Sequence, residues 1–248
     1  MIELVRGNIL AADAEAIVNT VNCVGVMGKG LALQFKKAHP ENFEAYRHAC
    51  AAGEVQPGRM FVHATGRMTV PRALLIKLMD QYAAMAYRLT LLEIQKLAYF
   101  LQEAGQPLRL QYTAGHYGPY APNLNKVLEA LEGHYTRGYG DSAKPDVEVQ
   151  LLEGANQEAD AFLAAHQAEH ERLERVSRLI SGFETPYGME LLASVHWLAL
   201  HGEPPAVDAE AAIQGMASWN DRKRRMLQPE HIRVAWERLD SEDWLQRG

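Results

Sequence analysis

Asparagine and glycine residues gather near the N-terminus in a pattern that suits the binding of a ribose and a diphosphate. Asn19 and Asn22 follow a short apolar run, and their side chains can both donate and accept hydrogen bonds, as ribose hydroxyls require. Gly25, Gly28 and Gly30 let the backbone approach a ligand closely, so that successive N–H groups can converge on phosphate oxygens. The pattern predicts a nucleotide-phosphate cradle.

A strand before this cradle and a helix after it would hold it in place. Ile17 and Val18 are apolar and β-branched, which is typical of a sheet covered on both faces, and we expect a strand over residues 16–21. A helix expected from about Leu31 would add its N-terminal dipole to the phosphate site, with Lys29 as an extra positive charge. No Ser or Thr follows the lysine, so the loop does not match the P-loop pattern.

Three segments of this region carry a family resemblance. Gly7-Asn-Ile-Leu10, Ile17-Val-Asn-Thr-Val-Asn22 and Gly25-Val-Met-Gly-Lys-Gly30 resemble the opening of a macrodomain, the α/β module that binds ADP-ribose. They are similar to the macrodomain of the DarG family of antitoxins, which oppose DNA-modifying toxins of the DarT family. The residues that the resemblance assigns to ADP-ribose binding are Asn8, Ile9, Asn19, Asn22, Gly25, Met27, Gly28, Lys29 and Gly30.

Two of these assignments are specific. By resemblance Asn22 would contact the distal ribose, while the loop from Gly25 to Gly30 would wrap the diphosphate. Asn8 stands where many macrodomains carry an Asp that binds the adenine amino group. An amide accepts that hydrogen bond more weakly than a carboxylate does.

The composition is that of a soluble globular protein. The chain has 248 residues, of which 48% are hydrophobic and 23% charged. No apolar run approaches the roughly 20 residues of a membrane span, and the N-terminus does not look like a signal peptide. Cys23 and Cys50 lack metal-ligand spacing. We therefore expect a cytoplasmic protein with reduced thiols, no cofactor and no membrane partner.

The net charge of −6 is unevenly distributed. Residues 1–75 hold eight Lys or Arg against six Asp or Glu, so the remaining residues carry −8. An acidic second part does not suit a free DNA-binding domain. It would suit a basic partner surface, although solubilising surface charge explains it equally well.

The macrodomain resemblance stops after Thr69. The later strands, the second glycine-rich loop and the strand-end lysine that DarG-type enzymes use against the glycosidic carbon have no counterpart, and the partial sheet leaves an apolar edge uncovered. Lys77 is expected on a solvated helix face rather than in that catalytic role. The sequence predicts an α+β protein with a partial macrodomain over residues 1–71 and a mostly helical domain over 72–248.

The second part reads as a series of helices. Thr90 and Glu93 form a capping box that starts one of them, Gly105 stops it, and Pro229 begins a last helix. A long helix is expected over residues 157–180. Strands are expected over 2–6, 59–64, 108–112 and 146–152, a helix over 31–51 and a loop over 133–145.

A second motif lies in this helical part. Glu93-Ile-Gln-Lys-Leu-Ala-Tyr-Phe-Leu101, together with Gly115-His-Tyr-Gly-Pro-Tyr120, is similar to the SocA-like, or Panacea, antitoxin domains. The resemblance implies that this domain binds a toxin in the groove meant for single-stranded DNA. Taken alone, Tyr117, Pro119 and Tyr120 form a stiff aromatic corner, which suits a core joint, a contact patch or a base-stacking platform.

Metal and catalytic chemistry receive little support. His166 and His170 are four residues apart on the expected long helix but have no third ligand in view, so we predict no metal site. The basic run Arg222-Lys-Arg-Arg225 is expected to be solvated. We name no catalytic residue and no toxin-contact residue.

Two functions follow from the resemblances. The first is an antitoxin that binds and neutralises a DarT-like DNA ADP-ribosyltransferase through residues 72–248. The alternative is a glycohydrolase that removes ADP-ribose from thymidine in DNA, with ADP-ribose or ADP-ribosylated DNA as a weak ligand. The absent lysine and second loop argue against that activity.

Overall fold

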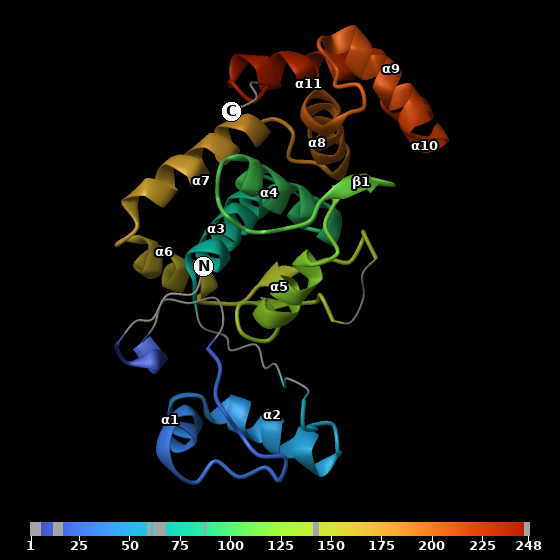
Figure 1. Cartoon of the computed structure of the whole chain (residues 1–248). Helices are drawn as coiled ribbons and strands as arrows, with labels where there is room; N and C mark the ends of the chain where they lie inside the picture. The colour runs from blue at the N-terminus through green and yellow to red at the C-terminus, as the bar shows by residue number, and fades with distance from the viewer. Residues whose placement is uncertain are drawn as a thin grey trace. The chain divides into compact units, whose positions relative to one another are not determined.

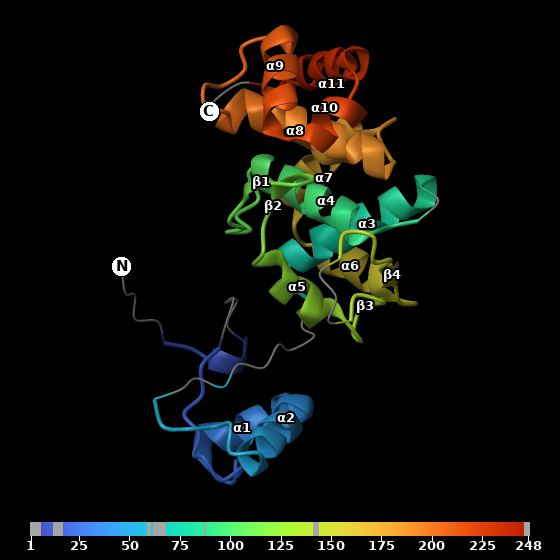
Figure 2. The same ribbon diagram turned by 90° about the vertical axis from the view of Figure 1, so that its right-hand side faces the viewer.

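The computed structural model describes residues 6–11, 17–58, 61, 68–86, 88–140 and 144–245. It divides the chain into two compact units, Met1–Thr65 and Gly66–Gly248. Figure 1 and Figure 2 label the helices and strands of each unit. The domain boundary at residue 71 stays a prediction.

The first unit contains a 3-10 helix, η1 (Ile9–Ala11), and two α-helices, α1 (Gly30–Ala38) and α2 (Pro40–Ala51). The helix expected over residues 31–51 is therefore broken at His39. The break has a local cause, because a proline disfavours helical geometry in the residue before it. His39 accordingly has φ −136° and ψ 72°, outside the helical region.

The strand expected over residues 16–21 is wrong for its described part, since residues 17–22 have no regular secondary structure. A strand needs a hydrogen-bonded neighbour, and the described residues of the first unit supply none. The strands expected over 2–6 and 59–64 lie outside the described residues, apart from Arg6 and Phe61. The valines of this region are correspondingly exposed, among them Val18 by 59% and Val24 by 75%.

The second unit is mainly helical. Its helices are α3 (Val70–Met85), α4 (Leu91–Glu103), α5 (Leu124–Leu131), α6 (Ala155–Leu163), α7 (Gln167–Ile180), α8 (Pro186–His201), α9 (Ala209–Trp219), α10 (Asp221–Met226) and α11 (Pro229–Ser241). Among the described residues, short strands form two antiparallel pairs. Strand β1 (Thr113–Gly115) pairs with β2 (Gly118–Tyr120), and β3 (Thr136–Arg137) pairs with β4 (Gln150–Leu151). The predicted α+β class is confirmed.

Helix α4 lies at the centre of the second unit, in contact with α3, α7, α8 and β2 (Figure 1). Its predicted capping box is present, because the Glu93 carboxylate accepts from the Thr90 N–H at 2.6 Å and the Thr90 hydroxyl caps the first turn. Residues 93–101 are all buried. A helix that is buried on every side belongs to the core, and α4 organises this unit.

Two other expectations are corrected. The long helix expected over residues 157–180 is interrupted between Leu163 and Gln167. Helices α6 and α7 both pack on α3, and the turn between them lets the chain stay in contact with α3. The strand over 146–152 shortens to β4, and the strand expected over 108–112 begins only at Thr113. The predicted start of the last helix at Pro229 is confirmed.

A buried histidine joins three elements of the core. His196 lies on α8. Its Nδ1 is 2.7 Å from the Tyr99 hydroxyl oxygen, and its Nε2 is 3.1 Å from the Trp244 carbonyl oxygen. A carbonyl only accepts, so Nε2 carries the proton and Nδ1 accepts from Tyr99. Burial lowers the pKa of His196 to about 3. The imidazole is therefore neutral in the folded protein at neutral pH.

This histidine predicts an acid-sensitive fold. Below pH ~6.5 the unfolded chain protonates at this position and the folded chain does not, so stability falls as the pH drops from ~6.5 toward 3. We expect the free energy of unfolding to fall by about 2–3 kcal/mol between pH ~7 and ~4.5 through this residue. Urea unfolding of wild type and His196→Gln at both pH values measures it. His134 is exposed, so His134→Gln should lose as much stability between the two pH values as wild type does. If His196→Gln also lost as much as wild type, the pH dependence would not come from His196.

Candidate functional site

In the first unit, Asn22 organises the loop that was expected to bind a diphosphate. Its amide Oδ1 accepts from the Val24 N–H at 2.9 Å, and its Nδ2 donates to the Val26 carbonyl at 2.8 Å. The hydroxyl of Tyr46 on α2 donates to Asn22, with 2.8 Å between it and Oδ1. The side chain expected to contact a ribose is thus hydrogen-bonded within its own loop.

Tyr46 was missed by the sequence analysis. It is fully buried, and its hydroxyl holds both the main chain and the side chain of Asn22. Burial raises the pKa of Tyr46, and the adjacent Cys50 raises it further. The sequence indicated only that a tyrosine lies on the inner face of an expected helix. Its spacing from Asn22 did not predict that its hydroxyl would bond to the loop.

The other predicted residues divide into packed and open positions. Met27 is buried, and Gly25 takes φ +74° where the loop rests on Arg47 of α2. The amide atoms of Asn19 are buried and have no hydrogen-bond partner among the described residues. Such a group costs stability unless something pairs with it. The loop therefore offers one unpaired polar side chain beside a preorganised backbone.

The start of α1 is open to a ligand. Lys29 is its N-cap residue, no side chain caps the first turn, and Gly30 has φ +57°. Free N–H groups at such an end bind anions. Gly28 adopts no left-handed conformation, and Asn8 uses its Oδ1 to accept from the Leu10 N–H at 3.1 Å, beside the partly exposed Ile9. The hydrogen bonds of the described residues do not join Asn8 to the loop.

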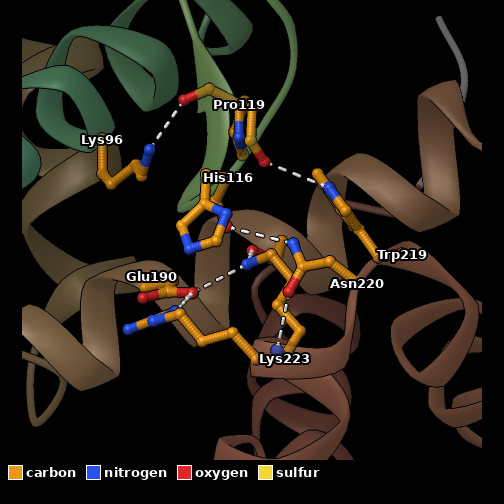
Figure 3. A network of polar contacts seen from close by, with 10 residues as sticks. Lys96, His116, Pro119, Glu190, Trp219, Asn220 and Lys223 are labelled. Atoms are coloured by element: carbon orange, nitrogen blue, oxygen red, sulfur yellow. Dashed lines mark hydrogen bonds and ion pairs between the residues drawn. The ribbon is translucent and has the colours of Figure 1, made fainter.

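In the second unit, the Gln-Lys motif fixes the β1–β2 hairpin on α4. The Gln95 amide bonds both to the Ala121 N–H, at 3.1 Å, and to the Ala121 carbonyl, at 3.2 Å. Lys96 is buried, and its ammonium donates to the Pro119 carbonyl at 2.7 Å (Figure 3). The interpretation of the aromatic corner as a core joint fits these contacts.

A buried charge cluster supports the hairpin from the other side. Lys223 donates to Glu190 at 2.9 Å and to the Ser194 hydroxyl at 2.8 Å, and Arg222 pairs with the same carboxylate. Figure 3 labels Glu190 and Lys223 of this cluster, together with Trp219 and Asn220. The Trp219 indole donates to the Gly115 carbonyl and the Asn220 amide to that of His116. The prediction that Arg222-Lys-Arg-Arg225 is solvated is therefore wrong for Lys223, which is fully buried.

The pKa values reflect this burial. Burial and the nearby Lys223 lower the pKa of Lys96 to about 7, against the opposing effect of Glu190. Burial also lowers the pKa of Lys223. The carboxyl of Glu190 is buried too, which raises its pKa, but the hydrogen bonds from Arg222 and Lys223 outweigh that effect and leave it below its usual value. The sequence feature that could have indicated this cluster is Glu190, a single carboxylate in the otherwise apolar helix α8.

A pocket of about 220 Å³ lies between α4 and the β1–β2 hairpin. Its wall includes Leu91, Leu92, Gln95, Lys96, Tyr117 and Tyr120. The wall is mostly apolar, and the hairpin that forms half of it is held by the contacts above. The pocket is the second candidate site of the chain.

Other candidate chemistry finds no support in the structure. Across the described ranges no group of three His, Cys, Asp or Glu side chains could hold a metal, and His166 instead stacks on Phe162. Lys77 is not solvated as expected, since it bonds to Asn156 at 2.6 Å and Asp160 at 2.8 Å. Among the helices that the structure describes, none has the length and apolar character to cross a membrane.

Comparison with known proteins defines the class of the first unit. The profile of the Macro domain family matches residues 18–78, which include the loop of Asn22 and the start of α1. The chain therefore contains part of a Macro domain.

The wider comparison reaches the whole chain. A DNA ADP-ribosyl glycohydrolase of Thermus aquaticus is 34% identical, and the match covers 96% of this chain and 93% of that protein. One of Mycobacterium tuberculosis is 31% identical over 96% of this chain and 99% of its own length. The chain belongs to the DNA ADP-ribosyl glycohydrolase family, the family of DarG.

A further relative joins two activities by name. It is a DNA ADP-ribosyl transferase-DNA ADP-ribosyl glycohydrolase fusion protein of Thermosipho africanus, 32% identical over 62 residues. That match covers 25% of this chain and 16% of the fusion protein.

The alignments also measure what the chain lacks. The match with the Thermus protein extends over 338 positions, 90 more than the 248 residues of this chain. At least 90 positions of the relative thus stand opposite gaps here.

The hairpin anchor gives a stability prediction. Gly118 has φ +94°, and a Cβ there would lie 2.7 Å from the Ser194 hydroxyl. Gly118→Ala should lose about 1–2 kcal/mol to the left-handed backbone and about 1–3 kcal/mol more to the clash, as measured by urea unfolding. Gly133→Ala, with φ +77° and open space around its Cβ position, is the control and should lose only the backbone cost. Equal losses would show that the anchor tolerates the added methyl group.

Proposed function

We propose that this chain is an antitoxin that binds and neutralises a DNA ADP-ribosyltransferase of the DarT family through residues 72–248. The observation that carries the proposal is the contrast between its two parts. The family relatives extend over at least 90 positions that this chain lacks, whereas the second unit has a continuous buried core. We infer that the gap removes most of the macrodomain and leaves the partner-binding part intact.

The charge of the second part supports a basic partner. Residues 76–248 carry −8, and exposed carboxylates lie on several of its helices, such as Glu171 and Glu174 on α7 and Glu237 on α11. A toxin that modifies single-stranded DNA needs a positively charged groove for the strand. An acidic protein surface can occupy such a groove and exclude the substrate.

The name of the Thermosipho relative supports the same pairing. A protein described as a fusion of a DNA ADP-ribosyl transferase and a DNA ADP-ribosyl glycohydrolase unites the two partners in one chain. Fusion keeps both proteins at high effective concentration.

The second candidate function is hydrolysis of ADP-ribose from DNA, which the names of the relatives suggest. Asn19 and the open start of α1 favour a weak ADP-ribose site. Catalysis would also need a group that acts at the anomeric carbon and a closed phosphate site. Lys77 cannot serve, because Asn156 and Asp160 hold its ammonium.

Antitoxin action predicts a stable complex. Co-expression of the chain with a DarT-family transferase should give one species by affinity purification and size-exclusion chromatography. Asn22→Ala, which changes only the first unit, should leave this complex unchanged, whereas Gly118→Ala should reduce its yield. Separate elution of the two wild-type proteins would overturn the proposal.

The missing segment predicts a large loss of hydrolase activity. Loss of a group that stabilises the transition state typically costs 10²–10³ in rate. We expect this chain to release ADP-ribose from modified single-stranded DNA at least ~100-fold more slowly than a full-length relative such as the Thermus protein, measured with both proteins at equal concentration. Rates within about tenfold of each other would restore the hydrolase function.

A further inference from the structure

The pocket between α4 and the β1–β2 hairpin has the size of one ring. Pockets that bind drug-sized ligands enclose about 300–1,000 Å³, and a cavity of about 150 Å³ holds benzene. At about 220 Å³ this pocket has room for a single aromatic ring with a small substituent. It is too small for a nucleotide.

The wall of the pocket is both apolar and fixed. Leu91 and Leu92 come from the first turn of α4, and Tyr117 and Tyr120 come from the hairpin. Gln95 holds the hairpin at Ala121 from one side, while the Trp219 and Asn220 side chains hold its turn from the other. A pocket that is already formed binds its ligand without the cost of ordering its wall.

Positive charge is in excess around this pocket. Lys223 and Arg222 both pair with the single carboxylate of Glu190, and the charges of Lys223 and Glu190 also act on the nearby Lys96. The guanidinium of Arg222 also lies over the ring of Tyr117, at 4.5 Å from its centre. Buried charges are normally paired, so this cluster has room for one more anion.

Lys96 is the cation nearest to the pocket. It forms part of the wall, and its Nζ would lie 3.7 Å from a Cβ on Gly118, another wall residue. Its ammonium has three donors but donates to one described acceptor, the Pro119 carbonyl. Burial lowers the pKa of this lysine, and the positive charge of Lys223 lowers it further.

We propose that this pocket binds a free small-molecule anion with one aromatic ring, an aryl monocarboxylate. The ring lies against the leucines and tyrosines, and the carboxylate pairs with the Lys96 ammonium. The proposal concerns a ligand other than the toxin and ADP-ribose, and it does not rest on the proposed function.

Sodium benzoate is the probe, and isothermal titration calorimetry of the full chain at about pH 6 measures its binding, since the lysine is charged there. We expect saturable binding with a dissociation constant of about 1 mM or below. Benzyl alcohol, which has the ring without the charge, and phosphate, which has charge without the ring, should each bind at least about tenfold more weakly.

Two variants assign the contacts. Lys96→Met should remove the preference for benzoate over benzyl alcohol, and Leu92→Trp, which fills the pocket and leaves Lys96 in place, should abolish binding of both. Lys77→Met removes a lysine that bonds to α6 and should bind benzoate like wild type. Circular dichroism and cooperative unfolding confirm that each variant is folded.

Several results would overturn the proposal. Equal affinity for benzoate and benzyl alcohol would show an apolar niche without a charge preference. Equal affinity for benzoate and phosphate would show a general cationic surface. Absence of saturable benzoate binding, or binding unchanged in folded Leu92→Trp, would place no such ligand in this pocket.

Discussion

The attachment of the β1–β2 hairpin to helix α4 is the contact on which the second unit depends. Two consecutive polar residues of a buried helix, Gln95 and Lys96, bond to backbone atoms of Ala121 and Pro119. A buried polar side chain is tolerated only when its hydrogen bonds are made. The motif therefore specifies one docking position for the hairpin, and it gives the otherwise apolar core a unique arrangement.

The buried ammonium of Lys96 lies near a second buried lysine, Lys223, and near the carboxylate of Glu190. Lys223 and Glu190 form an ion pair behind the hairpin, and Arg222 adds a second cation to the same carboxylate. Such a pair adds little net stability but is costly to break once it is buried. The pair ties α10 to α8 close to α4, although Glu190 and Lys223 lie 94 and 127 residues beyond Lys96 along the chain.

The sequence could predict elements whose causes are local. The capping box at Thr90, the helix stop at Gly105 and the helix start at Pro229 depend on neighbouring residues, and all three were predicted. The strand over residues 16–21 was wrong because a strand depends on partners elsewhere in the sheet. The buried position of Lys223 was missed for a similar reason, since its partner Glu190 is 33 residues away.

The hydrogen bonds of Asn22 bear on how such sequences are recognised. Its amide closes the loop, and Tyr46 fixes it from α2, so this residue has a structural task without any ligand. Substitution would remove one of the two hydrogen bonds of the buried Tyr46 hydroxyl and the internal bonds of the loop. Pressure to keep the protein folded can therefore preserve this asparagine independently of any ribose that the loop binds. A motif search that scores this loop therefore scores a folding element as well as a candidate ligand site.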